Sequence, residues 1–442
     1  MINRLFRPTY GNLCFWVFLY RIILDFIFSR VLVVYYDYYS FVDNSTIDTI
    51  IISWLVLILI MYVGRYTYIK TSPVTNQVLF FLFLLSFIPF SSMIGYGNFE
   101  YEYVVANSIY FMVLFAFNRY YEKCGKYRIA INISSLAGEM QLKIICILSL
   151  LVILYISYIY TGLRLSVDIS DALNWRSAAK QFDIPIVFRY LFSWTKSVNS
   201  ILMLFFVIKR ELIWAVICIA VQVLGFGING MKYTLFLGML TLIIACLPKF
   251  NELKVGQISL VAMVGVAIIC VLEIILFNSW YLSSFVLMRL FFIPNLLGAQ
   301  YFEFFTTHTP DYFRGSFLRH LGFVTPYPDL QHLITAYFTG DSQTGSNSGL
   351  IADAMTNFGY IGVIIAPILL VIVLRFLDRT MEGLDVRIKV AEAVALTLLI
   401  ISTFLLPLLL TDGLLIMFIL FNAMKRTELS ERKTGIQIQD NV

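Results

Sequence analysis

The chain has 442 residues, of which 60% are hydrophobic and 13% are charged, and its formal net charge is +5 at pH 7. Its mean hydropathy of +0.83 excludes a water-soluble globular protein. Because apolar segments recur from end to end, the composition predicts a single all-α polytopic integral membrane domain over residues 1–442.

The first apolar segment follows a basic N-terminus, Met1 to Arg7. It is too long for a secretory signal and lacks a small-residue cleavage site, so we expect it to remain as a membrane anchor. A bilayer core of about 30 Å requires about 20 apolar residues in a helix. This criterion predicts about twelve transmembrane helices, near residues 12–35, 49–69, 78–95, 101–118, 143–162, 196–208, 211–226, 231–248, 257–277, 358–375, 390–408 and 411–424.

The distribution of charge predicts the orientation of these spans. Lysine and arginine gather in alternate connections, for example Lys70 and Arg119, whereas Asp48 and Glu100 belong to the connections between them. By the positive-inside rule the basic connections are cytoplasmic, and an even number of spans places both termini there. The positive net charge therefore indicates topology and not a nucleic-acid partner.

Two predicted extracytoplasmic loops, residues 163–195 and 278–357, are too long to be simple turns. Aromatic residues such as Trp175 and Trp194 favour a helix at the membrane interface in the first loop. Within the spans, Arg21 and Asp25 are one helical turn apart, which predicts a structural ion pair. The glycines Gly225, Gly227 and Gly230 indicate a turn.

The basic residues of the two long loops are six arginines and one lysine: Arg164, Arg176, Lys180, Arg189, Arg289, Arg314 and Arg319. A guanidinium binds two phosphate oxygens at once and keeps its charge in a desolvated site. This bias favours a diphosphate ligand on the outer face. For any single arginine, contact with lipid headgroups remains an equal alternative.

All three histidines, His308, His320 and His332, lie in the second loop. Histidine, with an ordinary pKa of about 6.5, can take up and return a proton at neutral pH. We expect His332, His320 or the carboxylate Asp353 to act as a general base, with Asp353 the most open to a site at the membrane edge. The other carboxylates of the same loop compete for this role: Glu303, Asp311, Asp329 and Asp341. A histidine bonded to loop backbone is the alternative for each. The histidine spacing lacks the short pair typical of zinc ligands, so neither a metal nor a cofactor is expected.

Five stretches of the chain carry a resemblance: Arg289-Leu-Phe-Phe-Ile-Pro294, Tyr301-Phe-Glu-Phe-Phe305, Pro326-Tyr-Pro328, Gly345-Ser-Asn347-Ser-Gly349-Leu-Ile-Ala-Asp353 and Asn357-Phe-Gly-Tyr-Ile-Gly362. Residues 285–365 and the layout of spans resemble the bacterial oligosaccharide repeat-unit polymerases of the Wzy type, which polymerise O-antigen or capsular polysaccharide.

This resemblance implies a GT-C-like glycosyltransferase of the bacterial inner membrane that needs no metal. It would transfer a growing glycan from undecaprenyl diphosphate to an incoming lipid-linked repeat unit. Implied partners are undecaprenyl-diphosphate-linked oligosaccharide, membrane lipids, a chain-length regulator and a repeat-unit flippase. Arg289 matches the family-like motif as a diphosphate or structural anchor, and Asn347 would orient sugar hydroxyls. Arg176, Arg189, Arg314 and Arg319 are further candidates for binding the diphosphate.

Three alternatives remain open. An O-antigen ligase differs only in its acceptor, and a structural subunit of an export complex would need no catalytic residues. A lipid-linked oligosaccharide flippase or other transporter would show internal repeats and charged cavity residues over both halves of the chain. Because the polar residues concentrate in two outer loops, the sequence favours catalysis.

Overall fold

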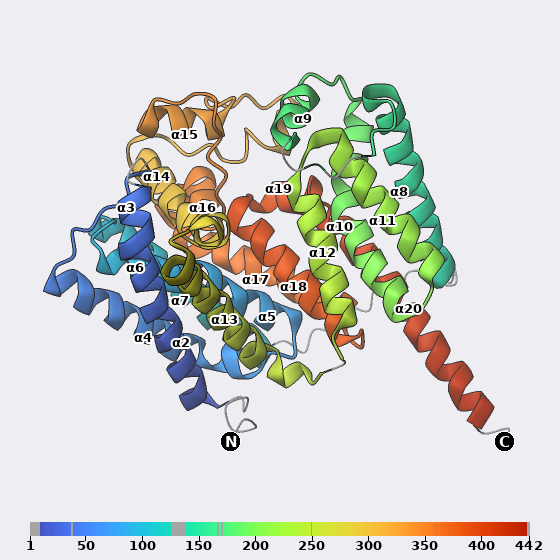
Figure 1. The fold of residues 1–442 in the computed structure, drawn as a ribbon, viewed down its shortest axis with the longest axis horizontal. Coiled ribbons are helices and arrows are strands. Elements are labelled where there is room, and N and C mark those ends of the chain that lie inside the picture. The colour runs from blue at the N-terminus through green and yellow to red at the C-terminus, as the bar shows by residue number, and fades with distance from the viewer. Residues whose placement is uncertain are drawn as a thin grey trace. The chain divides into compact units, whose positions relative to one another are not determined.

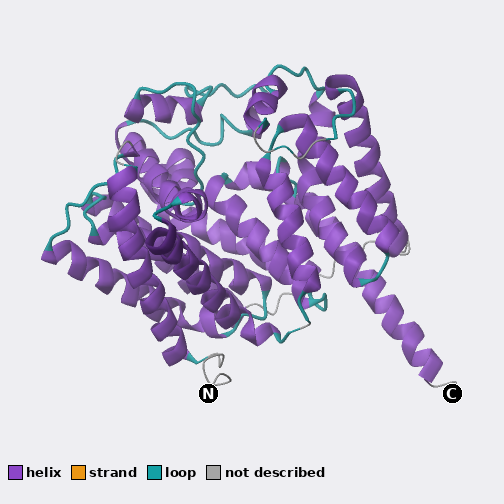
Figure 2. Ribbon diagram, in the orientation of Figure 1, coloured by secondary structure: helices purple, strands orange, loops and turns teal. Residues whose placement is uncertain are grey.

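The computed structural model describes residues 9–36, 39–124, 138–165, 168, 171–248 and 250–439. Over these residues the regular structure is helical and no strand is present (Figures 1 and 2). The basic segment Met1 to Arg7 lies outside them. The chain divides into two compact units: unit 1 is Met1–Lys126, Phe250–Arg375 and Leu396–Leu405, and unit 2 is Tyr127–Lys249, Phe376–Ala395 and Leu406–Val442.

In the described part of the chain, nine helices are long and apolar enough to cross a membrane, which confirms a polytopic membrane protein. Eight of them overlap predicted spans, and the other four predicted spans also fall on helices. The ninth, Ser283–Thr307, lies where a loop was predicted. The nine are Ile47–Ile69, Val74–Gly95, Gly138–Thr161, Ile186–Ile208, Leu212–Asn229, Glu252–Phe277, Ser283–Thr307, Ile351–Met381 and Leu405–Glu428.

Unit 1 is built from an N-terminal part, a later part that begins at Phe250 and a short stretch of α18 (Val386–Ser402) and its C-terminal connection. Its first part is formed by α2 (Tyr10–Ile27), η1 (Phe28–Leu32), α3 (Val33–Tyr35), α4 (Ile47–Ile69), α5 (Val74–Leu82), η3 (Phe83–Phe87), α6 (Ile88–Gly95) and α7 (Tyr101–Cys124). Its later part is formed by η4 (Glu252–Lys254), α13 (Val255–Phe277), η5 (Ser283–Phe292), α14 (Ile293–Thr307), η6 (Phe317–Leu321), α15 (Leu330–Thr339), α16 (Ile351–Phe358), η7 (Gly359–Ile361) and the start of α17 (Gly362–Met381).

Contacts define two opposite ends of unit 1. At one end, which we call the acidic end, the ring of Tyr35 stacks on Trp280 at 3.8 Å, and the hydroxyl of Thr49 donates to the carbonyl of Gly95. At the other, the basic end, Lys70 pairs with Glu122. Arg375 also lies at the basic end, so α17 runs towards it from the acidic end. The helices α4, α5–α6, α7, α13 and α17 alternate in direction, as the sequence predicts.

The helical segment Ser283–Thr307 begins and ends at the acidic end, although it is long enough to cross a membrane. At its start, the hydroxyl of Ser284 hydrogen-bonds that of Tyr36. Just after its end, Pro310 lies 3.2 Å from the position of a Cβ on Gly359, next to the start of α17. The segment is π-helical over Ser283–Phe292 and changes to α-helix beside Pro294. Both termini of this helical segment therefore lie at the acidic end, and we call it the re-entrant segment.

The predicted ion pair inside the first span is confirmed. Arg21 is 2% exposed, and its Nε donates to Asp25 Oδ1 at 2.8 Å. Its other nitrogens donate to Ser91 and Ser53, on α6 and α4. Because a buried guanidinium needs every donor satisfied, the pair fastens three helices together.

Unit 2 is a second helical bundle. It contains α8 (Gly138–Thr161), α9 (Ala172–Ala179), α10 (Ile186–Ile208), α11 (Leu212–Asn229), α12 (Lys232–Cys246), most of α18 (Val386–Ser402) and α19 (Leu405–Leu410), and α20 (Leu414–Gln439). The predicted loop 163–195 is thus partly helical, since α10 begins at Ile186. Of the three glycines of the predicted turn, Gly230 ends α11 with a φ of 61°, whereas Gly225 and Gly227 lie inside that helix.

Candidate functional site

Backbone strain in the described residues gathers in the segment 278–357. Seven non-glycine residues have a positive φ, and four of them lie here: Asn278, Tyr312, Phe313 and Leu350. Left-handed backbone is unfavourable for side chains other than glycine and persists only where surrounding contacts enforce it. The segment is therefore a built structure, and it holds most of the residues that the sequence selects.

A small pocket opens where the re-entrant segment, near Pro294, meets the chain that leads into α16. Asn295 ties the segment to its neighbours: its amide donates to the carbonyls of Ser86 and Phe291, and Tyr103 donates to the Asn295 carbonyl. The lining mixes polar and apolar side chains and contains no charged residue, so a neutral hydroxyl or amide suits it better than a diphosphate. Lining residues include Ser86, Tyr103, Asn107, Asn295, Ser348 and Ile401.

The chain beside this pocket packs very closely on α18. The N–H of Gly349 donates to the carbonyl of Ile401 at 2.8 Å. A Cβ on Gly349 would lie 1.9 Å from the carbonyl oxygen of Ile400, so only glycine allows this approach. Asn347, the predicted ligand of sugar hydroxyls, is exposed, whereas its two neighbours in the sequence, Ser346 and Ser348, are buried.

His332 lies in the first turn of α15 and is paired with a carboxylate. Its Nδ1 is 2.8 Å from Asp329 Oδ1, and its side chain is 31% exposed. In the neutral imidazole a proton on Nδ1 leaves Nε2 as an acceptor, which is the arrangement of a general base held by an acid. The helix α15 is fixed to the chain that precedes α16, because the hydroxyl of Thr335 hydrogen-bonds that of Ser346.

The other two histidines differ from His332. His308 stacks on Phe304 with ring centroids 3.9 Å apart, and its Nδ1 lies 2.9 Å from the Phe304 carbonyl oxygen. This is the backbone-bonded arrangement that the sequence left open. The backbone of His320 belongs to η6, and its side chain lies outside the described part of the structure.

Asp353 is buried, which corrects the expectation that it is the carboxylate most open at the membrane edge. It is 8% exposed, and both oxygens accept hydrogen bonds. Oδ2 accepts the N–H of Leu405 at 2.9 Å, and Oδ1 accepts the amide of Asn357 at 2.6 Å. The packing of α16 into unit 1 removes this carboxylate from solvent.

The candidate arginines have different environments. Arg289 is exposed on η5, and Arg319 is exposed on η6. Arg314 folds back on its own turn, where its guanidinium donates to the carbonyls of Asp311 and Pro310. In unit 2, Arg176 is exposed on α9, and Arg189 is exposed on α10 and donates to the carbonyl of Ile184. Three candidates thus belong to unit 1 and two to unit 2.

The charged residues in the core of unit 2 were missed by the sequence analysis. Lys196 and Asp412 form an ion pair of 3.0 Å, with side chains 13% and 10% exposed. Glu392, on α18, is 2% exposed. Charges within membrane-spanning helices are costly and usually functional. These residues could have been recognised as single charges inside apolar stretches of the sequence. That signal was used for Arg21 and Asp25 but not for these three residues.

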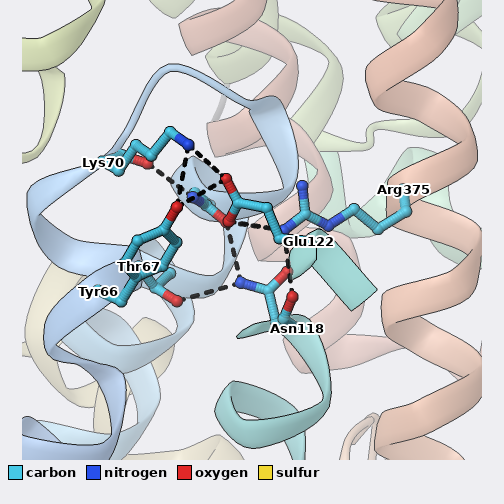
Figure 3. A network of polar contacts seen from close by, with 7 residues as sticks. Tyr66, Thr67, Lys70, Asn118, Glu122 and Arg375 are labelled. Carbon is cyan, nitrogen blue, oxygen red and sulfur yellow. Dashed lines mark hydrogen bonds and ion pairs between the residues drawn. The ribbon is translucent and has the colours of Figure 1, made fainter. Parts of the chain in front are cut away.

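A polar network joins three helices at the basic end of unit 1 (Figure 3). Lys70 Nζ lies 2.6 Å from Glu122 Oε1, to which the Tyr66 hydroxyl also donates, and Arg375 reaches Glu122 Oε2 at 3.5 Å. The hydrogen bond to Glu122 raises the pKa of Lys70. Because its members come from α4, α7 and α17, the network fastens these helices together.

Among the described residues, no group of three His, Cys, Asp or Glu side chains could hold a metal ion. Comparisons with protein-family models, with curated proteins and with solved structures gave no match to this chain. The fold therefore defines the class, a polytopic helical membrane protein, and the activity must be argued from the site.

Proposed function

We propose that this chain is a membrane glycosyltransferase that polymerises lipid-linked oligosaccharide repeat units for O-antigen or capsular polysaccharide. The observation that carries the proposal is the pair of His332 and Asp329. Both residues belong to the segment 278–357, which also contains Arg289, Arg314 and Arg319. The family-like motifs of the sequence fall on this same segment. A general base and several arginines on one segment of the chain suit transfer from a diphosphate donor.

In the proposed reaction, His332 Nε2 accepts the proton of a sugar hydroxyl on the incoming repeat unit. The hydroxyl oxygen bonds to the anomeric carbon of the growing glycan, and the bond from that carbon to the diphosphate oxygen breaks. Undecaprenyl diphosphate leaves with the electron pair. We propose that Arg289 and Arg319, both exposed, offset its charge.

The orientation we propose places the acidic end outside a bacterial inner membrane and both termini in the cytoplasm. Support comes from the opposite ends of unit 1, since Asp48 and Glu100 lie at one and Lys70 and Arg375 at the other. The substrate side then agrees with the side on which lipid-linked repeat units are polymerised. A chain-length regulator and a repeat-unit flippase remain proposed partners.

The test is the surface-glycan profile of a strain that lacks this chain, on a gel that separates lipid-linked from lipopolysaccharide-linked sugars. Collapse of the ladder to a single capped repeat unit supports a polymerase. Polymer that accumulates on undecaprenyl diphosphate, with capping lost, means an O-antigen ligase and contradicts the proposal.

A transporter of lipid-linked oligosaccharide is the second candidate, and one observation favours it. Charged residues are buried or half-buried in both units, Arg21 and Asp25 in unit 1 and Lys196, Asp412 and Glu392 in unit 2. Such a distribution over both parts of the chain is typical of transporters. In the same strain, lipid-linked units held on the cytoplasmic face would identify this activity.

A further inference from the structure

We infer that Asp353 is a positioning residue that holds an arginine-bearing turn, residues 311–316, through Asn357. This inference rests on the proposed function, because it assigns the proton transfer to His332 and a supporting role to Asp353.

The connection is a chain of hydrogen bonds from α16 to the turn. Asp353 Oδ1 accepts the amide N–H of Asn357 at 2.6 Å. Asn357 Oδ1 in turn accepts the backbone N–H of Phe313 at 2.8 Å. Since the other oxygen, Oδ2, accepts the N–H of Leu405 at 2.9 Å, Asp353 joins three separate segments of unit 1.

The turn needs such a support because its backbone is strained. Tyr312 and Phe313 are consecutive non-glycine residues with φ values of 53° and 66°. The N–H that Asn357 Oδ1 accepts is that of Phe313, one of these two residues. A second anchor lies beside them, where the N–H of Asp311 donates to the carbonyl of Thr356 at 2.6 Å and Asp311 Oδ2 accepts the N–H of Gly315. Both anchors come from α16.

The turn controls two of the candidate arginines. Arg314 lies within it and donates to the carbonyls of Asp311 and Pro310. Arg319 follows directly on η6, whose first turn is joined to the turn by a bond from the N–H of Arg319 to the carbonyl of Ser316. Loss of the Asn357 contact would therefore displace both guanidinium groups while leaving His332 and Asp329 intact.

The direction of each hydrogen bond makes the arrangement testable. Asn357 must donate to residue 353 and accept from Phe313, so residue 353 must accept from both Asn357 and Leu405. Asp353→Asn would place two amide nitrogens face to face, and Asn357→Asp would place two carboxylates face to face. The exchange D353N/N357D restores these three bonds: Asn at 353 accepts from Leu405 and donates to Asp at 357, which accepts from Phe313. Only the longer bond from the Asn357 amide to the backbone carbonyl of Asp353, 3.2 Å, is lost.

The experiment compares the wild type, D353N, N357D and the exchanged double variant in detergent. The first readout is the rate of tryptic cleavage after Arg319, which reports on the turn without any substrate. The second is polymer length in cells, normalised to the amount of protein in the membrane. Glu102→Gln, which removes an exposed carboxylate of α7, is the matched control and should equal the wild type in both readouts.

We expect each single variant to be cleaved several-fold faster and to lose long polymer, and the double variant to recover both properties. If the single variants do not accumulate in the membrane, the amount of the double variant in the membrane is the readout. A normal amount supports the inference, and an equally low amount contradicts it. Unchanged cleavage in well-expressed single variants would overturn the inference, whatever the activity. Recovery of cleavage resistance without polymer would mean that the Asp353 carboxylate acts chemically. If the wild type itself makes no polymer, the proposed function fails and the cleavage result still decides the role of Asp353.

Discussion

Lys196 Nζ lies 3.0 Å from Asp412 Oδ1, and these residues join α10 to the connection between α19 and α20 in unit 2. The neighbouring contact runs the same way, since the indole N–H of Trp194 donates to the carbonyl of Leu410 at 2.6 Å. Two bonds thus hold the first half of α10 against a segment more than 200 residues away in the chain.

The first prediction concerns this ion pair. Asp412→Leu leaves a buried ammonium without a partner, and we expect a loss of about 3 kcal/mol in the free energy of unfolding. The double variant K196M/D412L should lose less than either single variant, because no charge is left unpaired. Thermal unfolding in detergent measures both. The pair Lys425–Glu382, in which Glu382 is 81% exposed, is the control and should contribute less than about 1 kcal/mol. Equal losses at the two pairs would contradict the argument.

Close packing at Gly349 gives the second prediction. Because a Cβ would lie 1.9 Å from the carbonyl oxygen of Ile400, Gly349→Ala must displace α18 or the chain before α16. We expect a large drop in unfolding temperature. Gly265→Ala is the control: no atom lies within 4 Å of its added Cβ, and helix propensity should raise stability by about 0.5 to 1 kcal/mol. A Gly349→Ala protein as stable as the wild type would contradict this prediction, because α18 would then move aside at no cost in stability.

The third prediction separates the histidines. His332→Ala should reduce polymerisation by about 10² or more, because a general base contributes a factor of this size. Asp329→Asn should cause a smaller loss, since it disturbs the imidazole without removing it. His308→Ala, which removes a ring stacked on Phe304, should retain activity. Transfer measured with lipid-linked repeat units and purified protein decides this, and an active His332→Ala protein would exclude His332 as the base.

For the fourth prediction, Arg289→Ala should abolish long polymer without reducing the amount of protein in the membrane. Lysine at 289 should restore activity only in part, because it is a point charge and cannot bind two phosphate oxygens at once. Arg30→Ala, which removes another exposed arginine of unit 1, is the control and should leave the polymer unchanged. Normal polymer from a well-expressed Arg289→Ala protein would remove Arg289 from the site.

The fifth prediction is that transfer survives EDTA. Arginines are proposed to offset the charge of the leaving diphosphate, so chelation should not change the rate. The assay is transfer by purified protein before and after chelation, with added Mg²⁺ as the comparison. Strict dependence on a divalent ion would contradict the proposed role of the arginines and direct attention to the carboxylates and histidines of residues 278–357.

Local pairs were within reach of the sequence. Arg21 and Asp25 are four residues apart and were predicted correctly as a structural pair. The contact between His332 and Asp329 is also local, at three residues, and helical spacing could have indicated it. The two were instead expected to compete for the role of the base, and their helical spacing was not considered.

The re-entrant segment could not be predicted from hydropathy. Arg289, Pro294 and Asn295 lower the apolar character of Ser283–Thr307 and suggest a loop. In the folded chain, Asn295 is buried, and its amide is satisfied by the carbonyls of Ser86 and Phe291, which offsets the cost of burial. Whether a polar residue is tolerated in the core depends on partners that are distant in the sequence.

Composition and the period of apolar residues by themselves determined the class of protein, the positions of most spans and their alternation, because burial in lipid constrains each span independently of the others. Only the tertiary structure decided that Ser283–Thr307 returns to the end at which it begins, and that Lys196 meets Asp412. It also decided that both oxygens of Asp353 are engaged. Those results depend on hydrogen bonds and close contacts between residues far apart in the chain, and such contacts leave no periodic pattern in the sequence.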